Sequence, residues 1–286
     1  MNISTHSQPV SAELRLWIVA QAEAGCRPED LLASMRTSGW AEDVAIEALE
    51  STLTQRLEQL GLPLPGAAAP LPEPALDRQP ATIFALDREV QIISTLRLPR
   101  VVVLGGLLAI EECEGLMALS RTRLARSQTV DNQTGGSEVN AARTSDGMFF
   151  ERGEFALIDR IERRIAALIN WPLDHGEGLQ VLRYGPGAEY RPHYDYFDVA
   201  QPSAATILQR GGQRVGTLIM YLSTPQRGGA TVFPDAGLEV LPVQGNAVFF
   251  SYDRPHPATH TLHGGAPVLD GEKWVATKWL RERVFV

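Results

Sequence analysis

The second half of the chain consists of short β-favouring segments separated by Gly and Pro turns, and this pattern limits the possible folds more than any other feature. The segments are Leu179–Tyr184, Gly216–Leu222, Ala230–Phe233, Glu239–Val243, Ala247–Tyr252 and Trp274–Trp279. Many short strands joined by tight turns are typical of a sandwich or a jelly roll. We therefore expect a mainly β domain here.

Additional strands and two helices are expected ahead of these segments. Val90–Ile93 and Val101–Leu104 are apolar runs of strand length. Ile110–Leu124 and Phe155–Ile169 carry apolar side chains at helical spacing. Because these helices come before most of the strands, the predicted fold class is mainly β with flanking helices.

The first 60 residues differ in character and predict a small helical bundle. Leu14, Trp17 and Ile18 recur at helical spacing, and similar patterns continue to Leu60. The stretch from Gly61 to Pro80 then contains six prolines and an alanine run, which is typical of a semi-rigid linker. We therefore expect a helical domain at 1–60, a Pro/Ala-rich linker at 61–80 and a larger domain at 81–286.

Charge and composition argue against several classes of protein. The net charge of −8 disfavours nucleic-acid binding, which usually needs a basic face. No apolar stretch has the length of a membrane span, and the polar N-terminus does not resemble a signal peptide. The two cysteines, Cys26 and Cys113, imply no disulfide framework. We expect a cytoplasmic protein without a nucleic-acid or membrane partner.

The pattern His193-Tyr194-Asp195 is the sharpest chemical feature. In an extended segment, residues i and i+2 project to the same side, so this imidazole and carboxylate would lie side by side. A second, distant histidine would complete the two-histidine, one-carboxylate triad of non-haem iron(II) enzymes. His256, His260 and His263 are the candidates for that third ligand.

Lysine is rare in this chain, and its placement is informative. Only two of the 26 basic residues are lysines, Lys273 and Lys278. In a strand, Lys273 would share a face with Trp279, and it follows His263 by ten residues. A single inward lysine suits a point-charge contact with a dicarboxylate. The alternatives are a solvated strand charge or chance in an arginine-rich chain.

Seven ordered segments support a more specific interpretation. They are Arg143–Phe149, Leu179–Gly185, Tyr190–Asp195, Gln213–Thr217, Gly228–Pro234, Leu262–Gly265 and Gly271–Trp274. With these segments, the chain from Pro99 to Val286 resembles the prolyl 4-hydroxylase family of Fe(II)- and 2-oxoglutarate-dependent dioxygenases, as a bacterial member. The resemblance implies a double-stranded β-helix, a distorted jelly roll.

The resemblance also implies a role for individual residues. It places the iron on His193, Asp195 and His263. It places Lys273 on the distal carboxylate of 2-oxoglutarate, with further cosubstrate contacts from Tyr184, Thr231 and Trp279. It makes Tyr190 and Arg214 catalytic residues that also face the substrate. Arg143 and Ser145 would lie in a mobile loop, from Arg143 to Phe149, that closes over a peptide.

The activity implied is 4-hydroxylation of prolyl residues in a peptide or protein, with succinate and CO2 as co-products. Its cofactors would be Fe(II), 2-oxoglutarate and O2, with ascorbate as a further candidate. One alternative keeps the iron site but hydroxylates a free amino acid or small metabolite. Another is a non-catalytic barrel with a partner-binding helical module. In either enzyme, the N-terminal helices would recruit a protein partner or cap the barrel.

Overall fold

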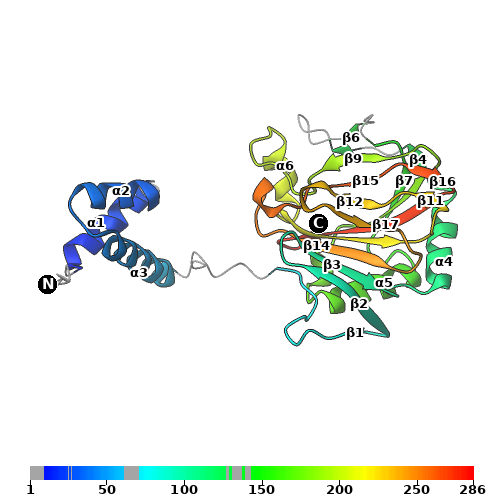
Figure 1. Ribbon diagram of the computed structural model, residues 1–286, viewed down its shortest axis with the longest axis horizontal. Helices are drawn as coiled ribbons and strands as arrows, with labels where there is room; N and C mark the ends of the chain where they lie inside the picture. Colours follow the sequence, from blue (N-terminus) through cyan, green and yellow to red (C-terminus); the bar gives the residue numbers. More distant parts are fainter. Residues whose placement is uncertain are drawn as a thin grey trace. The chain divides into compact units, whose positions relative to one another are not determined.

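The structure is a computed structural model of the 286-residue chain. It describes residues 10–24, 26, 28–60, 71–126, 129–130, 137–138 and 143–286. The chain divides into two compact units, Met1–Ala69 and Pro70–Val286 (Figure 1). This division falls within the stretch that the sequence predicts to be a linker, so we describe each unit by itself.

The smaller unit contains helices where the sequence predicted them: α1 (Ala12–Glu23), α2 (Pro28–Thr37) and α3 (Glu42–Leu60). The Ser11 hydroxyl caps α1 by accepting a hydrogen bond from the Leu14 N–H at 3.2 Å. The three helices bury a common apolar core of Ile18, Leu31, Met35, Ala45, Ala48 and Leu49. No helix among the described residues is both long enough and apolar enough to cross a lipid bilayer.

The larger unit is built around a nine-stranded antiparallel sheet, ordered β1-β2-β3-β14-β10-β17-β8-β7-β4 (Figure 1). Its first four strands in this order are β1 (Thr82–Ala85), β2 (Arg88–Leu96), β3 (Arg100–Gly105) and β14 (Ala247–Ser251). The others are β10 (Arg214–Tyr221), β17 (Lys273–Arg281), β8 (Leu179–Tyr184), β7 (Asp146–Phe150) and β4 (Ala125–Arg126).

A second, four-stranded sheet has the order β13-β12-β15-β9. Its strands are β13 (Leu238–Val240), β12 (Thr231–Phe233), β15 (His263–Gly265) and β9 (Tyr190–His193). Two strand pairs complete the β structure: β11 (Arg227–Gly228) with β16 (Val268–Asp270), and β5 (Thr129–Val130) with β6 (Ser137–Glu138). Apolar residues of the two larger sheets, such as Val275 and Phe233, form one buried cluster, so these sheets face each other.

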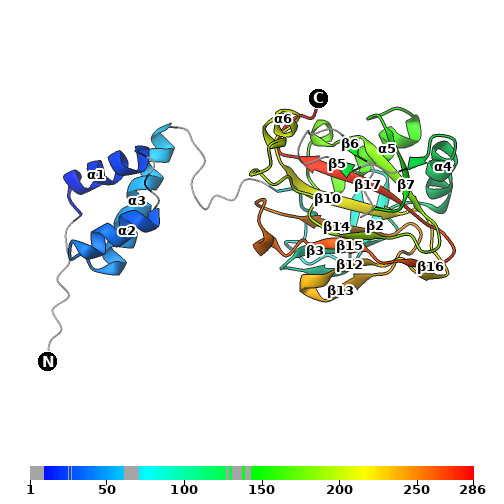
Figure 2. The ribbon, with the colours of Figure 1, turned by 90° about the horizontal axis from the view of Figure 1, so that it is seen from above.

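Helices cover the other face of the nine-stranded sheet (Figure 2). Residues of α4 (Ile110–Ser120) and α5 (Ala156–Leu168) share a buried apolar cluster with that sheet. A short helix, α6 (Ala204–Gln209), and three 3-10 turns, Leu173–His175, Pro234–Ala236 and Pro257–Thr259, lie in connections. The mainly β fold with flanking helices that the sequence predicted is therefore present.

Strand β17 belongs to both cores, because successive side chains point to opposite faces. Trp274, Ala276 and Leu280 contribute to the cluster on the helix side, whereas Val275 belongs to the cluster between the sheets. Every residue of the strand is buried. Side chains of this one strand can therefore serve either packing or an internal site.

Two segments differ from the expectation. The prediction of a mobile loop from Arg143 to Phe149 is wrong for most of that segment, because Asp146–Phe150 is strand β7 and pairs with β8. In addition, part of the predicted linker packs on the larger unit. Leu71 and Leu76 contact its core, and the Glu73 N–H donates to the Ile169 carbonyl at 2.8 Å.

Candidate active site

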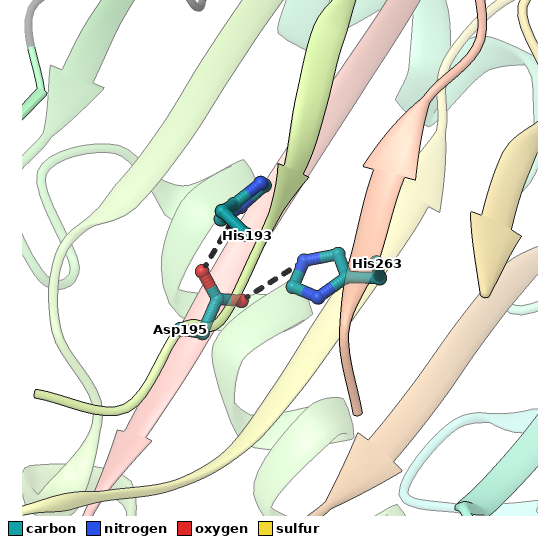
Figure 3. Close-up of side chains that lie close together, drawn as sticks. All are labelled: His193, Asp195 and His263. Carbon is teal, nitrogen blue, oxygen red and sulfur yellow. Dashed lines mark ion pairs between the residues drawn. The ribbon is translucent and has the colours of Figure 1, made fainter. Parts of the chain in front are cut away.

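Two short strands bring His193, Asp195 and His263 together (Figure 3). His193 ends β9 and His263 begins β15, and the two are direct partners in the antiparallel register. The Nε2 atom of His193 lies 3.5 Å from Asp195 Oδ1, and that of His263 lies 3.4 Å from Oδ2. All donor atoms lie within 4.8 Å of one another. The structure thus selects His263 from the three candidate histidines.

Hydrogen bonds to the backbone hold both imidazole rings in the tautomer that can bind a metal through Nε2. His193 Nδ1 lies 2.9 Å from the carbonyl oxygen of Arg191, and His263 Nδ1 lies 3.0 Å from that of Thr261. A carbonyl oxygen only accepts, so each Nδ1 must carry the proton. With Nδ1 used in this way, Nε2 is the nitrogen of each ring that is left to bind a metal ion, and both Nε2 atoms face Asp195.

The carboxylate of Asp195 has its own support. The Thr217 hydroxyl donates to Asp195 Oδ2 at 2.8 Å, and the Tyr252 hydroxyl lies 3.2 Å from that of Thr217. Burial raises the pKa of Asp195, but the neighbouring His263 and His193 outweigh burial and hold the pKa well below its ordinary value. Asp195 is therefore an ionised ligand, and its two carboxylate oxygens lie beside the Nε2 atoms of the two histidines. This donor set fits iron(II) and leaves coordination positions open.

A cavity next to this triad is lined by both facing sheets. The smaller sheet contributes Tyr190, His193, Thr231, His263, Gly264 and Gly265. The larger sheet contributes Leu182, Tyr184, Ile219, Lys273, Val275, Thr277 and Trp279. Arg143 and Asp195, which lie outside these strands, complete the lining. The predicted common face of Lys273 and Trp279 is confirmed, and Val275 and Thr277 lie on the same face.

Lys273 is a buried amine that has no ionic partner among the described residues. Its side chain is 4% exposed, and no hydrogen bond or ion pair joins Nζ to any residue in the described part of the chain. Burial lowers its pKa to about 7. A Cβ atom added at Gly265 would lie 3.8 Å from Nζ, so the lysine reaches across the cavity to β15. The site therefore offers a positive charge to an anionic ligand.

Other predicted cosubstrate contacts lie around this lysine. Nζ is 5.7 Å from the ring centre of Tyr184 and 5.9 Å from that of Tyr221. The Tyr221 hydroxyl donates to Thr231 Oγ1 at 2.9 Å, which leaves the threonine hydroxyl proton available to a ligand. Trp279 forms part of the cavity wall, and its Nε1 has no hydrogen-bond partner in the described part of the chain.

Of the predicted substrate-facing residues, Arg143 and Tyr190 line the cavity. The Tyr190 ring stacks on His193, with 3.7 Å between ring centres, and the Arg143 guanidinium lies 4.8 Å above the same tyrosine. Burial raises the pKa of Tyr190 to about 12, so its hydroxyl is protonated at neutral pH. Ser145 is buried and does not line this cavity.

Arg214 was predicted to face the substrate, yet its guanidinium is occupied within the protein. It forms two hydrogen bonds to Glu177, at 2.7 and 2.9 Å, and donates to the Asp195 carbonyl oxygen at 3.3 Å. It also stacks on Trp279 at 4.0 Å, and Arg281 binds the same Glu177 carboxylate at 3.0 Å. Arg214 does not line the cavity, and its contacts are those of a residue that positions Asp195 and Trp279.

Several supporting residues were missed at the sequence level. Thr217 lies in the Gln213–Thr217 motif, which could have drawn attention to it. Glu177, Tyr221 and Tyr252 carried no local signal, because each meets its partner through the fold. His256 and His260 are outside the metal-ligand cluster, and His256 Nδ1 instead accepts from the Ala258 N–H at 3.0 Å.

Comparison with known proteins gives a consistent result. Residues 179–281 match the model of the 2OG-Fe(II) oxygenase superfamily. Probable prolyl 4-hydroxylase 3 from Arabidopsis thaliana is 42% identical over 203 residues, which cover 64% of this chain and 69% of that protein. Prolyl 4-hydroxylase 1 from the same plant is 43% identical over 204 residues, covering 65% and 70%.

A solved structure was also found. The viral collagen prolyl hydroxylase of Paramecium Bursaria Chlorella virus-1, in its complex with 2OG, is 30% identical, with a TM-score of 0.48. The match covers 63% of this chain and 95% of the viral chain. On the sequence relatives and the oxygenase domain, the chain belongs to the prolyl 4-hydroxylase family and is a dioxygenase dependent on Fe(II), 2-oxoglutarate and O2.

Proposed function

We propose that this enzyme hydroxylates prolyl residues of a peptide or protein at the 4-position, and that its two facing sheets form a double-stranded β-helix. The observation that carries the proposal is the pairing of the His193–Asp195–His263 cluster with the unpaired cation of Lys273 in one cavity. The similar plant proteins are named prolyl 4-hydroxylases, which supports proline as the target.

In this proposal, His193 Nε2, Asp195 and His263 Nε2 hold Fe(II). Bound Fe(II) and 2-oxoglutarate supply the oxidising chemistry, in which O2 is consumed, succinate and CO2 are released and the substrate gains a hydroxyl group. The protein contributes orientation and a shielded site. The Nδ1 hydrogen bonds to the Arg191 and Thr261 carbonyls fix the ring orientations before any metal arrives.

Lys273 is proposed to bind the distal carboxylate of 2-oxoglutarate. Its ammonium group has no partner among the residues that the structure describes, so a carboxylate would supply the missing counter-charge in a partly desolvated cavity. The Thr231 hydroxyl, whose oxygen already accepts from Tyr221, would donate to the same carboxylate. Tyr184 would add a second donor, whereas Trp279 would form the wall at the other end of the cavity, because it is the cavity-facing residue of β17 that lies furthest from Lys273.

For the substrate, we propose direct contact with Arg143 and Tyr190, which line the cavity beside the metal ligands. Ser145 would act from beneath this surface, because it is buried and follows Arg143 by two residues. Arg214 would act as a positioning residue: it donates to the Asp195 carbonyl and stacks on Trp279. An extended proline-containing peptide suits such a site, since its preset backbone loses little entropy on binding.

The decisive experiment supplies the full chain with Fe(II), 2-oxoglutarate and O2. A blocked proline-containing peptide and free L-proline are compared as substrates, with succinate release and product mass as the readouts. We expect a mass increase of one oxygen in the peptide and 4-hydroxyproline after its hydrolysis. Efficient hydroxylation of free proline with an inert peptide would instead identify a small-metabolite hydroxylase.

We further propose that the N-terminal helices recruit a protein substrate or partner, because they form a separate compact unit with its own core. The test is a truncated chain that begins at Pro70, since residues 71–80 pack on the larger unit. Full turnover of short peptides with weaker turnover of whole-protein substrate would support recruitment. Loss of solubility or of peptide turnover would instead indicate that the helices stabilise the larger unit.

A further inference from the structure

Phe149 is an exposed aromatic residue beside the active-site cavity. Phe149 is 50% exposed, although it lies within strand β7. Its ring centre lies 6.3 Å from that of Trp279, which forms part of the cavity wall. A single exposed aromatic residue is common on protein surfaces, so the direction in which this ring points decides whether it can meet a substrate.

The strand register shows that Phe149 points to the cavity side of the sheet. Directly paired residues on antiparallel strands project from the same face. Phe149 pairs with Gln180, and Gln180 pairs with Thr277, which lines the cavity. The neighbours Met148 and Phe150 point the other way, into the cluster shared with α4 and α5. Phe149 therefore lies on the cavity-facing side of the nine-stranded sheet, beyond Trp279.

The position along the strands places this ring at one end of the site. Along β17, the cavity-facing residues run from Lys273, through Val275 and Thr277, to Trp279. Phe149 lies at the Trp279 end, away from the proposed cosubstrate end at Lys273. A ligand that leaves the cavity past Trp279 would next meet this ring.

Two buried donors at this end point to a ligand that brings acceptors. Arg143 Nε and Trp279 Nε1 are both buried and lack a hydrogen-bond partner among the described residues, and both side chains line the cavity. An unpaired buried donor is unfavourable unless a ligand or water satisfies it. The backbone carbonyls of an extended peptide are acceptors of this kind.

The backbone of β7 is anchored at the same position. The Arg123 guanidinium donates to the Phe149 carbonyl oxygen at 2.8 Å and pairs with Glu154 at 2.7 Å. The phenylalanine ring is thus presented from a fixed strand rather than from a loop. A rigid aromatic surface offers contact area to a ligand without a large loss of side-chain entropy.

We infer that Phe149, together with Trp279, forms an aromatic platform for a prolyl or other apolar side chain that flanks the target proline of the substrate. Phe149 would thereby determine specificity for the sequence around the target, without taking part in the reaction itself. The inference rests on the proposed function, because it requires a peptide substrate.

The test uses the full chain and two blocked nine-residue peptides with one target proline each. In the first, the flanking positions are proline; in the second, they are glycine and serine. Phe149→Ala should raise KM for the first peptide about threefold to tenfold, the range expected for one aromatic contact, with kcat nearly unchanged. KM for the second peptide should stay the same. Phe149→Trp should retain the wild-type preference.

A matched control is available on the opposite edge strand. Phe84 in β1 is 72% exposed, and Phe84→Ala should leave both KM values unchanged. As a readout independent of turnover, fluorescence anisotropy of the labelled proline-flanked peptide, measured anaerobically with Fe(II) and 2-oxoglutarate, should show weaker binding to Phe149→Ala.

The outcomes separate this inference from the proposed function. Wild-type enzyme that hydroxylates neither peptide would overturn both. Normal wild-type turnover, with Phe149→Ala unchanged or impaired equally on the two peptides, would overturn the platform alone. A raised KM for 2-oxoglutarate in Phe149→Ala would also contradict it, because the ring lies at the end of the cavity away from Lys273.

Discussion

The two lysines of the chain lie five residues apart on β17, and their surroundings are opposite in kind. Both are buried, at 4% exposed for Lys273 and 2% for Lys278. Lys278 points to the helix side, where it binds the Glu162 carboxylate and the Glu177 carbonyl oxygen. Lys273 points into the cavity and has no such partner in the described residues.

Burial lowers the pKa of both ammonium groups, but only at Lys278 does a nearby carboxylate, Glu162, oppose this effect. A buried charge with a partner connects two parts of the fold, here β17 and α5. A buried charge without a partner is costly in the free protein. Lys278 is therefore a structural residue, whereas Lys273 is available to a ligand.

The largest effect is expected on the cavity side, at the metal ligands. His263→Ala should remove nearly all succinate formation, because a two-ligand site holds iron weakly and in the wrong geometry. Circular dichroism should show a folded protein. His260→Ala is the matched control and should remain active, since His260 lies outside the ligand cluster. If His263→Ala stays active and His260→Ala does not, the third metal ligand is His260.

On the helix side, Lys278→Met should lower the free energy of unfolding without acting directly on the reaction. It leaves the Glu162 carboxylate buried without its cation, and breaking such a pair typically costs about 3–5 kcal/mol. Urea denaturation of the metal-free protein measures the change. Lys273→Met, in the same assay, should be as stable as wild type or more stable. Equal losses in the two variants would contradict the comparison.

Lys273→Ala should impair use of the cosubstrate. Removing one partner of a buried charge pair costs on the order of 2–5 kcal/mol, so the apparent KM for 2-oxoglutarate should rise at least about tenfold. Titration of 2-oxoglutarate at saturating peptide gives this value. Lys273→Arg preserves the charge and should lose less. A wild-type titration curve for Lys273→Ala would rule out this residue as the cosubstrate cation.

A smaller effect is expected from pH. The pKa of Lys273 is lowered by burial to about 7, so in the free enzyme the ammonium group loses its proton as pH rises through that value. A bound dicarboxylate favours the charged form, so binding above pH ~7 should take up a proton, and affinity should fall as pH rises. Calorimetry in buffers of different ionisation enthalpy measures this uptake. It should vanish in Lys273→Arg.

The sequence predicted several of the strands and metal ligands of this site, but few of the residues that hydrogen-bond to them. Short β-favouring segments between Gly and Pro turns located β8, β14 and β17, and the spacing of His193 and Asp195 predicted that these two side chains lie on one side. Strands β9 and β15 are too short to carry a periodic signal, although they hold the histidines. Lys273 stood out as a candidate because lysine is rare here.

The supporting contacts could not be predicted from local pattern. Glu177 and Arg214 are 37 residues apart, and Thr217 and Asp195 are 22 apart. Their pairing depends on how β10 lies against its neighbours, which no periodicity encodes. The segment from Arg143 to Phe149, by contrast, was expected to be a mobile loop. Pairing with β8 makes most of it, including Gly147, a strand.

The cavity is shared between two sheets, and this has a consequence for the stability of the whole unit. The histidines belong to the four-stranded sheet and Lys273 to the nine-stranded one, so a bound metal–cosubstrate pair would connect both. A ligand that binds only the folded state adds about 2.7 kcal/mol at a hundred times its Kd. Since the sheets could not part without releasing it, amide hydrogen exchange in β9, β15 and β17 should slow together when it binds.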